Sequence, residues 1–324
     1  MTTSFTPSRV VIGTRSSAMA MAQTAHVAAL LRRAHPGLAV HVAQIVTTAD
    51  KHKGPLDSVG GKQAWVRELD LALGALRADL TVSCAKDLPG EHERGTAAVI
   101  GAVLPRDDAR DALVLPLGAA PASLRDLPAG SVVGTIAPRR AAQLRAQFPH
   151  LEVAPLRGNL DTRISRLDEG SGERLDALVV SYAGLQRLGL VERAVDVLAP
   201  DSFLPATGAG FVVVEHRAGD RVAEGLLHAI SDPRAERLLR VERGVLGKLG
   251  GDCYTACSVH AAFDAAGQLT VAAGVFSPDG WSVIKTHAIS TAEDDQETVD
   301  RMVATLKREG AEALLLQARP ARGN

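Results

Sequence analysis

The feature that most constrains the fold is a regular alternation of short β-branched runs with longer segments of helical spacing. The first series runs through Val10–Gly13, Ala18–Arg33, Val40–Thr47, Ala64–Leu76 and Leu80–Ser83, which we expect to be strand, helix, strand, helix and strand. A second series of the same kind follows at Ser131–Thr135, Pro138–Gln147, Leu151–Pro155, Thr162–Leu167 and Ala177–Ser181. Two such βα modules predict parallel sheets with helices on both faces. The link near Pro105–Arg110 is a candidate hinge between them.

The last third of the chain has a different pattern. A helical segment over Ala235–Leu249 is expected to end at Gly250-Gly251. Three alternating segments then predict an antiparallel sheet, and they span Ser258–Phe263, Leu269–Val275 and Ser282–Ile289. Turn sequences 264-DAAG-267 and 277-SPDG-280 separate them, and a long helix is expected over Asp294–Leu316. This pattern predicts an α+β domain.

Composition excludes several classes of protein. With 324 residues the chain is long enough for two or three domains, and 46% hydrophobic residues indicate an ordinary globular protein. A net charge of −1 and only 3% aromatic residues argue against a nucleic-acid partner. The start MTTSFTPSRV is unlike a signal peptide, and apolar windows such as 177-ALVVSYAGL-185 are too short to span a bilayer, so we expect a cytoplasmic protein without a membrane partner.

Arginines recur just after the predicted strands. They are Arg15, Arg139, Arg140, Arg157 and Arg163. The carboxyl ends of parallel strands form the edge where ligands bind in such sheets, and guanidinium groups bind carboxylates bidentately. The set therefore suits a ligand that carries many carboxylates. Taken singly, each arginine is also compatible with a solvated surface position.

An acidic residue follows another predicted strand, in 80-LTVSCAKDLPG-90. Asp87 lies beside Lys86, and Pro89 favours an extended exit from this segment. A carboxylate near arginines stays ionised, so Asp87 suits the stabilisation of a cationic intermediate or the transfer of protons. The alternative is a surface Asp–Lys pair at a turn.

The stretch 249-LGGDCYTACSVHA-261 leaves several roles open for Cys253: metal ligand, disulfide partner, nucleophile, covalent tether or buried apolar residue. Three cysteines in a cytoplasmic chain do not indicate a disulfide framework. The spacing of Cys253, Cys257 and His260 matches no closed zinc site, so no metal is expected. Gly60-Gly61-Lys62 lacks the remainder of a nucleotide-binding loop.

Several motifs occur together in the order typical of one enzyme family. They are 12-IGTRSSAMAMAQ-23, 60-GGKQAWVRELDLAL-73, 77-RADLTVSCAKDLP-89, 107-DDARDALV-114, 156-LRGNLDTRISRLD-168, 183-AGLQRLGL-190 and the cysteine stretch. From about Val10 to its end the chain resembles hydroxymethylbilane synthase, also called porphobilinogen deaminase, a family of tetrapyrrole biosynthesis.

This resemblance implies an α/β fold of three domains. Two are doubly wound βα lobes similar to periplasmic binding proteins, and the third is a C-terminal α+β domain with a three-stranded antiparallel sheet. The expected boundaries are 1–103 with 200–220 for the first domain, 104–199 for the second and 221–324 for the third. Family members are usually monomeric, so a monomer is expected.

The resemblance also implies the chemistry. A dipyrromethane cofactor, made by the apoprotein from its own substrate, is held by Cys253 through a thioether. Four porphobilinogen molecules are added head to tail, each with loss of ammonia, and hydrolysis then releases a linear tetrapyrrole. A soft thiolate suits attack on the electrophile from which such a tether forms.

Roles for individual residues follow from the same resemblance. Asp87 is the expected catalytic residue, which handles protons and stabilises azafulvene cations. Cofactor contacts are expected, besides Cys253, from Ser17, Lys62, Lys86, Arg139 and Arg140. Substrate contacts are expected from Arg15, Trp65, Arg157, Arg163 and Arg187. Trp65 stands where the family usually has phenylalanine.

Some motifs depart from the family pattern. The departures are Asp252 before the cysteine, Ala256 after it, Ser83-Cys84-Ala85 before Lys86, Ala137-Pro138, Ala209 and Ser58. Because the main motifs persist beside these departures, we favour an active but divergent enzyme. One alternative, which the substitutions around Cys253 and Ala209 motivate, is a paralogue with an altered pyrrole substrate or product. The other is a non-catalytic protein that binds polycarboxylates.

Overall fold

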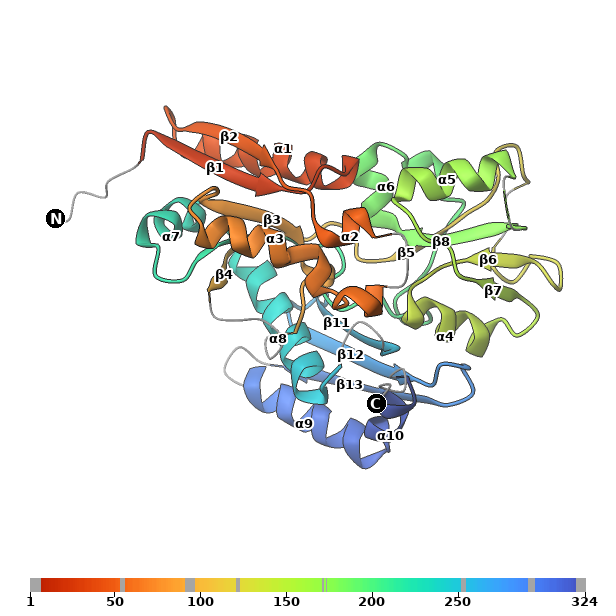
Figure 1. Cartoon of the computed structure of the whole chain (residues 1–324). Coiled ribbons are helices and arrows are strands. Elements are labelled where there is room, and N and C mark those ends of the chain that lie inside the picture. The colour runs from red at the N-terminus through yellow and green to blue at the C-terminus, as the bar shows by residue number, and fades with distance from the viewer. Residues whose placement is uncertain are drawn as a thin grey trace. The chain divides into compact units, whose positions relative to one another are not determined.

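The computed structural model describes residues 7–52, 56–90, 97–120, 123–170, 172, 174–251, 255–290 and 295–318. The chain divides into two compact units, and Figure 1 shows their elements. The first unit comprises Met1–Asp107 and Gly210–Arg240, and the second comprises Asp108–Ala209 and Val241–Asn324. The three-domain division expected from the sequence stays a prediction.

A five-stranded mixed sheet forms the centre of the first unit. Its strands are β1 (Arg9–Thr14), β2 (Ala39–Gln44), β3 (Leu80–Cys84), β4 (Ala98–Val103) and β10 (Val212–Arg217). They lie in the order β2-β1-β3-β10-β4. β1 pairs in parallel with β2 and β3, whereas β10 runs antiparallel to both β3 and β4. The parallel part of the sheet therefore has one carboxyl edge, from which the chain leaves β1 and β3.

The first unit contains the helices α1 (Ala18–Ala34), α2 (Thr48–Lys51), α3 (Gln63–Gly74) and α7 (Arg221–His228). α1, α2 and α7 each begin after a residue whose side chain accepts from a free backbone N–H, whereas α3 has no such side-chain cap. The Ser17 hydroxyl accepts a hydrogen bond from Ala20 N and so caps α1. α1 and α7 pack on the sheet through one apolar core that includes Ile12, Leu31, Leu80, Val214 and Leu227. Each of these fully buried side chains contributes about 1.5–3 kcal/mol to folding.

The second unit contains a sheet with the same pattern of strand directions but a different order of strands along the chain. Its strands are β5 (Asp111–Val114), β6 (Val132–Gly134), β7 (Glu152–Ala154), β8 (Ala177–Ser181) and β9 (Asp196–Val197), in the order β7-β6-β8-β5-β9. β6, β7 and β8 are parallel, and β5 is antiparallel to both β8 and β9. The associated helices are α4 (Pro138–Gln147), α5 (Leu160–Glu169) and α6 (Tyr182–Leu188). Pro138 opens α4, where its fixed φ suits a first turn.

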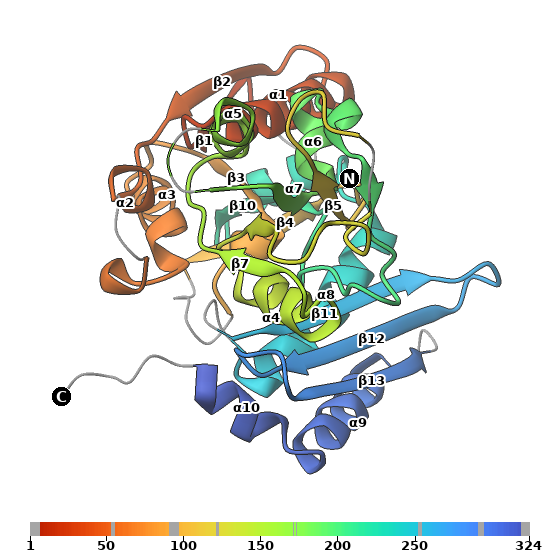
Figure 2. The same cartoon turned by 90° about the vertical axis from the view of Figure 1, so that its right-hand side faces the viewer.

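A separate antiparallel sheet completes the second unit. It consists of β11 (Cys257–Phe263), β12 (Leu269–Phe276) and β13 (Val283–Ser290), in that order. The helix α8 (Pro233–Leu249) precedes it, and α9 (Asp295–Arg308) and α10 (Ala311–Ala318) follow it. Figure 2 shows α9 lying along β13. A small apolar cluster of Ala142, Leu204, Ala256 and Phe276 joins this sheet to α4.

The predicted fold class is confirmed: two doubly wound βα lobes accompany a three-stranded antiparallel sheet. The expected helix over Pro138–Gln147 and the expected strand over Ala177–Ser181 have the observed bounds. The helix before the cysteine stretch ends as predicted, because Gly250 adopts a φ of 68° and the Gly250 and Gly251 N–H groups bond back to α8. None of the helices in the described ranges has both the length and the apolar character that a bilayer crossing requires.

Three expectations about the elements were wrong. The first two sheets are mixed, not parallel throughout, because β4, β5, β9 and β10 were not foreseen. The strand expected over Val40–Thr47 ends at Gln44, because Thr47 caps α2 instead. The long C-terminal helix is divided into α9 and α10 near Gly310, whose φ of 96° does not fit a continuous helix.

Candidate active site

Arg15 lies at the carboxyl edge of the first sheet, one residue beyond β1. Its guanidinium donates to both carboxylate oxygens of Asp50, from Nε to Oδ2 at 3.3 Å and from Nη2 to Oδ1. The central guanidinium carbon also lies 4.1 Å from the centroid of the Trp65 ring. The structure thus brings together two predicted site residues, Arg15 and Trp65, through a cation–π contact.

Asp50 was not foreseen as part of this site. Its carboxylate also accepts from Thr47 N at 3.1 Å and from Thr47 Oγ1 at 2.8 Å, which forms the capping box of α2. Burial alone would raise the pKa of Asp50, but hydrogen bonds from Arg15 and Thr47 outweigh it and hold that pKa below its usual value of 3.8. Asp50 is therefore ionised at neutral pH. The sequence signal for the capping box was present in 47-TTAD-50.

Two other predicted residues of the first unit lie at helix starts. Ser17 occupies the N-cap of α1, where its Oγ accepts from Ala20 N at 3.3 Å. Lys62 occupies the N-cap position of α3 and directly follows Gly61, whose φ is 62°. Anionic groups bind favourably near helix N-termini, because the unpaired N–H groups there carry partial positive charge.

Asp87 and Lys86 form the end of a short 3-10 helix, Ala85–Asp87, which directly follows β3. Both side chains are half-buried. Within the described ranges, the Asp87 carboxylate forms neither a hydrogen bond nor an ion pair. A carboxylate in this state keeps its acceptor capacity for a ligand. Since β1 and β3 are parallel neighbours, Asp87 and Arg15 leave the sheet at the same edge.

Arg139 and Arg140 occupy the first turn of α4 and converge on one buried carboxylate. Arg139 Nη2 lies 2.6 Å from Asp111 Oδ2, and Arg140 Nη2 lies 2.7 Å from Asp111 Oδ1. Arg139 also donates to the Leu204 carbonyl at 2.6 Å. Burial alone would raise the pKa of Asp111, but the two guanidinium charges lower it from 3.8 to about 2. Asp111 belongs to the quoted motif 107-DDARDALV-114, yet nothing in that pattern indicated its burial.

The remaining predicted arginines of the second unit follow β7 and β8. Arg157 lies between β7 and α5, Arg163 one turn into α5, and Arg187 in the last turn of α6. Arg157 Nη1 is buried and has no hydrogen-bond partner among the described residues. The following Gly158 has a φ of 122°, a conformation that other residues rarely adopt.

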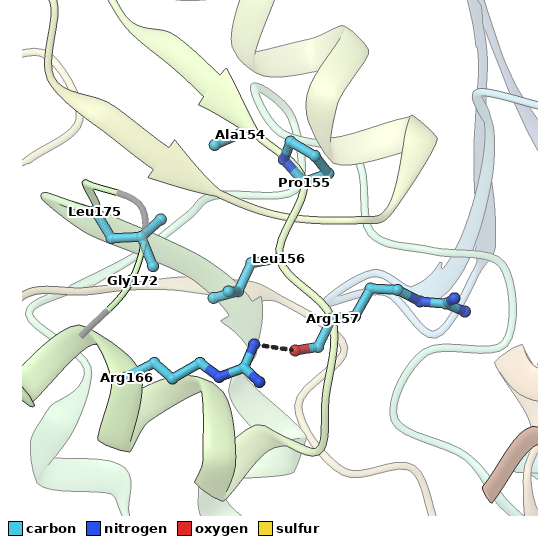
Figure 3. A pocket seen from close by; sticks show the side chains of 7 residues that line it. All are labelled: Ala154, Pro155, Leu156, Arg157, Arg166, Gly172 and Leu175. Carbon is cyan, nitrogen blue, oxygen red and sulfur yellow. Dashed lines mark hydrogen bonds between the residues drawn. The ribbon is translucent and has the colours of Figure 1, made fainter. Parts of the chain in front are cut away.

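A cavity of about 510 Å³ lies near Arg157, but it does not receive the guanidinium of that residue. It is lined by Ala154, Pro155, Leu156, Arg157, Arg166, Gly172 and Leu175. Figure 3 shows the side chain of Arg157 pointing away from the cavity, while its carbonyl accepts from Arg166 Nη1 at 3.4 Å. The cavity is therefore separate from the predicted role of Arg157.

Cys253 lies outside the described residues, as does the neighbouring Asp252. The described residues on either side are buried: Gly251 ends the turn after α8, and Thr255 and Ala256 lead into β11. Burial raises the pKa of the Cys257 thiol to about 12, so Cys257 stays protonated and is a poor nucleophile and metal ligand. Among the described residues, no group of three or more His, Cys, Asp and Glu side chains suits a metal ion.

The donor set suits a group with several carboxylates, such as the dipyrromethane. Two buried guanidinium nitrogens of the second unit, Arg157 Nη1 and Arg140 Nε, have no hydrogen-bond partner among the described residues. An unpaired buried N–H of this kind is costly, and a ligand carboxylate would satisfy it. The residues that the structure describes therefore fit a polyanionic cofactor.

The chain is similar to solved structures and to one family model. Among solved structures, the periplasmic VFT2 domain of BvgS from Bordetella pertussis is 15% identical, with a TM-score of 0.42 over 73% of this chain and 92% of that one. Residues 10–224 match the family model described as "Porphobilinogen deaminase, dipyromethane cofactor binding domain".

Curated relatives are similar over nearly the whole chain. "Porphobilinogen deaminase 2" of Streptomyces coelicolor is 38% identical over 95% of this chain and 97% of its own length. "Porphobilinogen deaminase" of Thiobacillus denitrificans is 40% identical over 94% of this chain and 97% of its own length. The chain therefore belongs to the porphobilinogen deaminase family.

Proposed function

We propose that the protein is a hydroxymethylbilane synthase, a transferase that condenses four porphobilinogen molecules head to tail and releases a linear tetrapyrrole by hydrolysis. Membership of the family supports this activity and its dipyrromethane cofactor. When bound, the cofactor supplies the pyrrole carbon to which the first substrate is joined. Cys253 is the residue proposed to hold it through a thioether.

The single structural observation that carries the proposal is the state of Asp87. Its carboxylate is half-buried at the carboxyl edge of the first sheet and has no internal partner among the described residues. In each condensation the aminomethyl nitrogen of porphobilinogen departs as ammonia while positive charge develops on the substrate. An ionised carboxylate stabilises that charge, and it accepts the proton that the reaction releases.

The cationic residues bind the carboxylates of substrate and cofactor. Every pyrrole unit carries an acetate and a propionate, so negative charge accumulates as the chain grows. Ser17, Lys62, Lys86, Arg139 and Arg140 are proposed to contact the cofactor. Arg15, Trp65, Arg157, Arg163 and Arg187 are proposed to contact the substrate. Bidentate guanidinium–carboxylate pairs fix orientation as well as affinity.

Incubation of the purified protein with porphobilinogen tests the function directly. We expect ammonia to be released in the same amount as porphobilinogen is consumed, with a linear hydroxymethyl tetrapyrrole as product. The intact mass of protein from cells that make porphobilinogen should exceed the polypeptide mass by two pyrrole units, and C253A should lose this adduct. Reversible binding without ammonia release would contradict the proposed function.

Asp87 is tested separately by D87N and D87E. We expect D87N to lower kcat about 10²–10⁴-fold, the usual contribution of a positioned acid or base, and D87E to retain part of the activity. E224Q, which changes an exposed carboxylate on α7 of the same unit, is the matched control. If D87N has the same kcat as E224Q, Asp87 has no part in the reaction.

A cytoplasmic location and a monomeric state complete the proposal. Light scattering across a range of concentrations should give the mass of one chain, 33.9 kDa before cofactor attachment. A larger mass that persists on dilution would contradict the monomer.

A further inference from the structure

The guanidinium of Arg15 is held from two sides by residues that come from different segments of the first unit. Asp50 in α2 accepts from Nε and Nη2, and the ring of Trp65 in α3 stacks on the guanidinium at 4.1 Å. Arg15 itself lies in the loop between β1 and α1. Three segments thus meet at one cation, although none of them requires it for its own secondary structure.

α2 and α3 are fixed to one another independently of Arg15. Thr48 Oγ1 in α2 donates to Glu68 Oε1 in α3 at 2.5 Å, and both views show the two helices side by side (Figures 1 and 2). Glu68 follows Trp65 by three residues, so the two side chains share one face of α3. The carboxylate and the ring that hold Arg15 therefore belong to one prearranged surface.

The geometry leaves one edge of the guanidinium available. Arginine presents five N–H groups in a planar fork. Asp50 engages Nε and one hydrogen of Nη2, which leaves both hydrogens of Nη1 and the second hydrogen of Nη2. Those two nitrogens form the end of the fork, which matches a second carboxylate bidentately. Asp50 and a ligand carboxylate do not compete for the same donors.

We propose that Asp50 and Trp65 are positioning residues that hold Arg15 with the end of its fork directed at a side-chain carboxylate of a pyrrole substrate. This inference rests on the proposed function for the identity of the ligand. An unrestrained arginine loses its rotamer freedom when it binds, and that loss weakens binding. In this protein the freedom is already lost on folding, so Arg15 is preorganised for the ligand.

A purely electrostatic role for Asp50 predicts the opposite effect. If the carboxylate only neutralised Arg15, its removal would strengthen anion binding and lower the KM for porphobilinogen. If it positions Arg15, its removal raises KM although the net positive charge at the site increases. The direction of the change in KM therefore distinguishes the two roles.

The first experiment measures steady-state kinetics of D50N, R15K and the double variant. D50N keeps an oxygen acceptor for Thr47, so the cap of α2 is preserved. We expect kcat/KM to fall about tenfold, mainly through KM, because a misdirected binding group loses much of its effect. The double variant should be no slower than R15K alone, because Asp50 acts through Arg15. A KM that is unchanged or lower in D50N, or losses that multiply in the double variant, would overturn the proposal.

T47A is the matched control for damage to α2. It removes the hydroxyl that accepts from Asp50 N at 3.3 Å and donates to Asp50 Oδ2 at 2.8 Å, but Thr47 N still donates to that carboxylate, which stays charged for Arg15. We expect a smaller rise in KM for T47A than for D50N. An equal rise would assign the effect to the helix cap and contradict the positioning role.

Fluorescence gives a readout that does not depend on activity. The chain has two tryptophans, and Trp281 is 88% exposed, so W281F leaves Trp65 as the only indole emitter. In this background D50N should shift the emission of Trp65, because the guanidinium is no longer held over the ring, whereas T47A should shift it less. Identical emission in W281F and in D50N combined with W281F would overturn the proposal. If the unsubstituted protein releases no tetrapyrrole, the proposed function fails, but this comparison still decides the role of Asp50.

Discussion

Two sheets of this protein have the same pattern of strand directions, yet the arginines that follow their central parallel strands lie in different environments. After β1, Arg15 is partly exposed, with 19% of its side chain accessible, and pairs with Asp50 at a helix start. After β6, Arg139 and Arg140 are 5% and 8% exposed and enclose Asp111, which is 2% exposed. Equivalent positions after the central parallel strand thus carry an accessible ion pair in one sheet and a buried ion cluster in the other.

This difference in exposure indicates that the role of a charged side chain depends on its burial and not only on its position in the fold. A buried carboxylate is tolerated only when its partners neutralise it and satisfy its oxygens. Asp111 meets this condition with two guanidinium groups, and Arg139 in turn satisfies the Leu204 carbonyl. We therefore expect the cluster of Asp111, Arg139 and Arg140 to contribute to folding as well as to the proposed cofactor contacts, and Arg15 to act mainly on the ligand.

The largest expected effect is that of D111A, which leaves two buried guanidinium charges without their carboxylate. We expect the free energy of unfolding to fall by about 3–5 kcal/mol, the usual consequence of removing one partner from a buried ion pair. Urea unfolding followed by circular dichroism measures it. D126A, which removes an exposed carboxylate of the same unit, is the control. If D111A and D126A unfold at the same urea concentration, the buried ion cluster does not contribute to folding as we expect.

The next effect is a loss of stability in acid. The pKa of Asp111 is about 2 in the folded protein against a usual value of 3.8, so its contribution is complete above 3.8 and is lost as the pH falls towards 2. The difference corresponds to about 2 kcal/mol. Unfolding of the unsubstituted protein and of D111N between pH 5 and pH 2.5 measures it. We expect the free energy of unfolding to fall less steeply with decreasing pH in D111N than in the unsubstituted protein. If the two proteins lose stability in parallel, Asp111 does not contribute to the loss of stability in acid.

A smaller effect is expected when the accessible pair is removed. D50N should lower the free energy of unfolding by about 0.2–1 kcal/mol, because a partly exposed ion pair is screened by water. The same urea experiment measures it beside D111A. D50N should raise the KM with only a small loss of stability. D111A should lower the free energy of unfolding strongly, and stability rather than KM should be its main effect. A loss in D50N as large as that in D111A would show that burial does not distinguish the two arginine sites.

The parts of the fold that the sequence predicts are those with a local physical signal. β-branched runs identify β1 and β8, and a proline followed by helical spacing identifies α4 with its observed bounds. β10 could not be placed in the same way, because its neighbours β3 and β4 come from a distant part of the chain. The local sequence pattern does not indicate which strands will pair, or whether they will pair in parallel or antiparallel.

The candidate site shows the same limit. Strand ends indicated Arg15 and Arg139 as functional, because a charge at that edge of a sheet has a general chemical meaning. Their carboxylate partners, Asp50 and Asp111, are 35 and 28 residues away, and only the folded chain brings them together. The roles of Cys253, Lys62 and Arg187 stay predictions of the resemblance.

The order of the strands along the chain has a consequence for biosynthesis. Within the first sheet, β10 separates β3 from β4, so β4 has no neighbour until Val212–Arg217 have left the ribosome. All five strands of the other doubly wound sheet lie between Asp111 and Val197 and emerge earlier. The nascent polypeptide can therefore close its internal sheet while the N-terminal one still has an open side, the reverse of simple N-to-C folding.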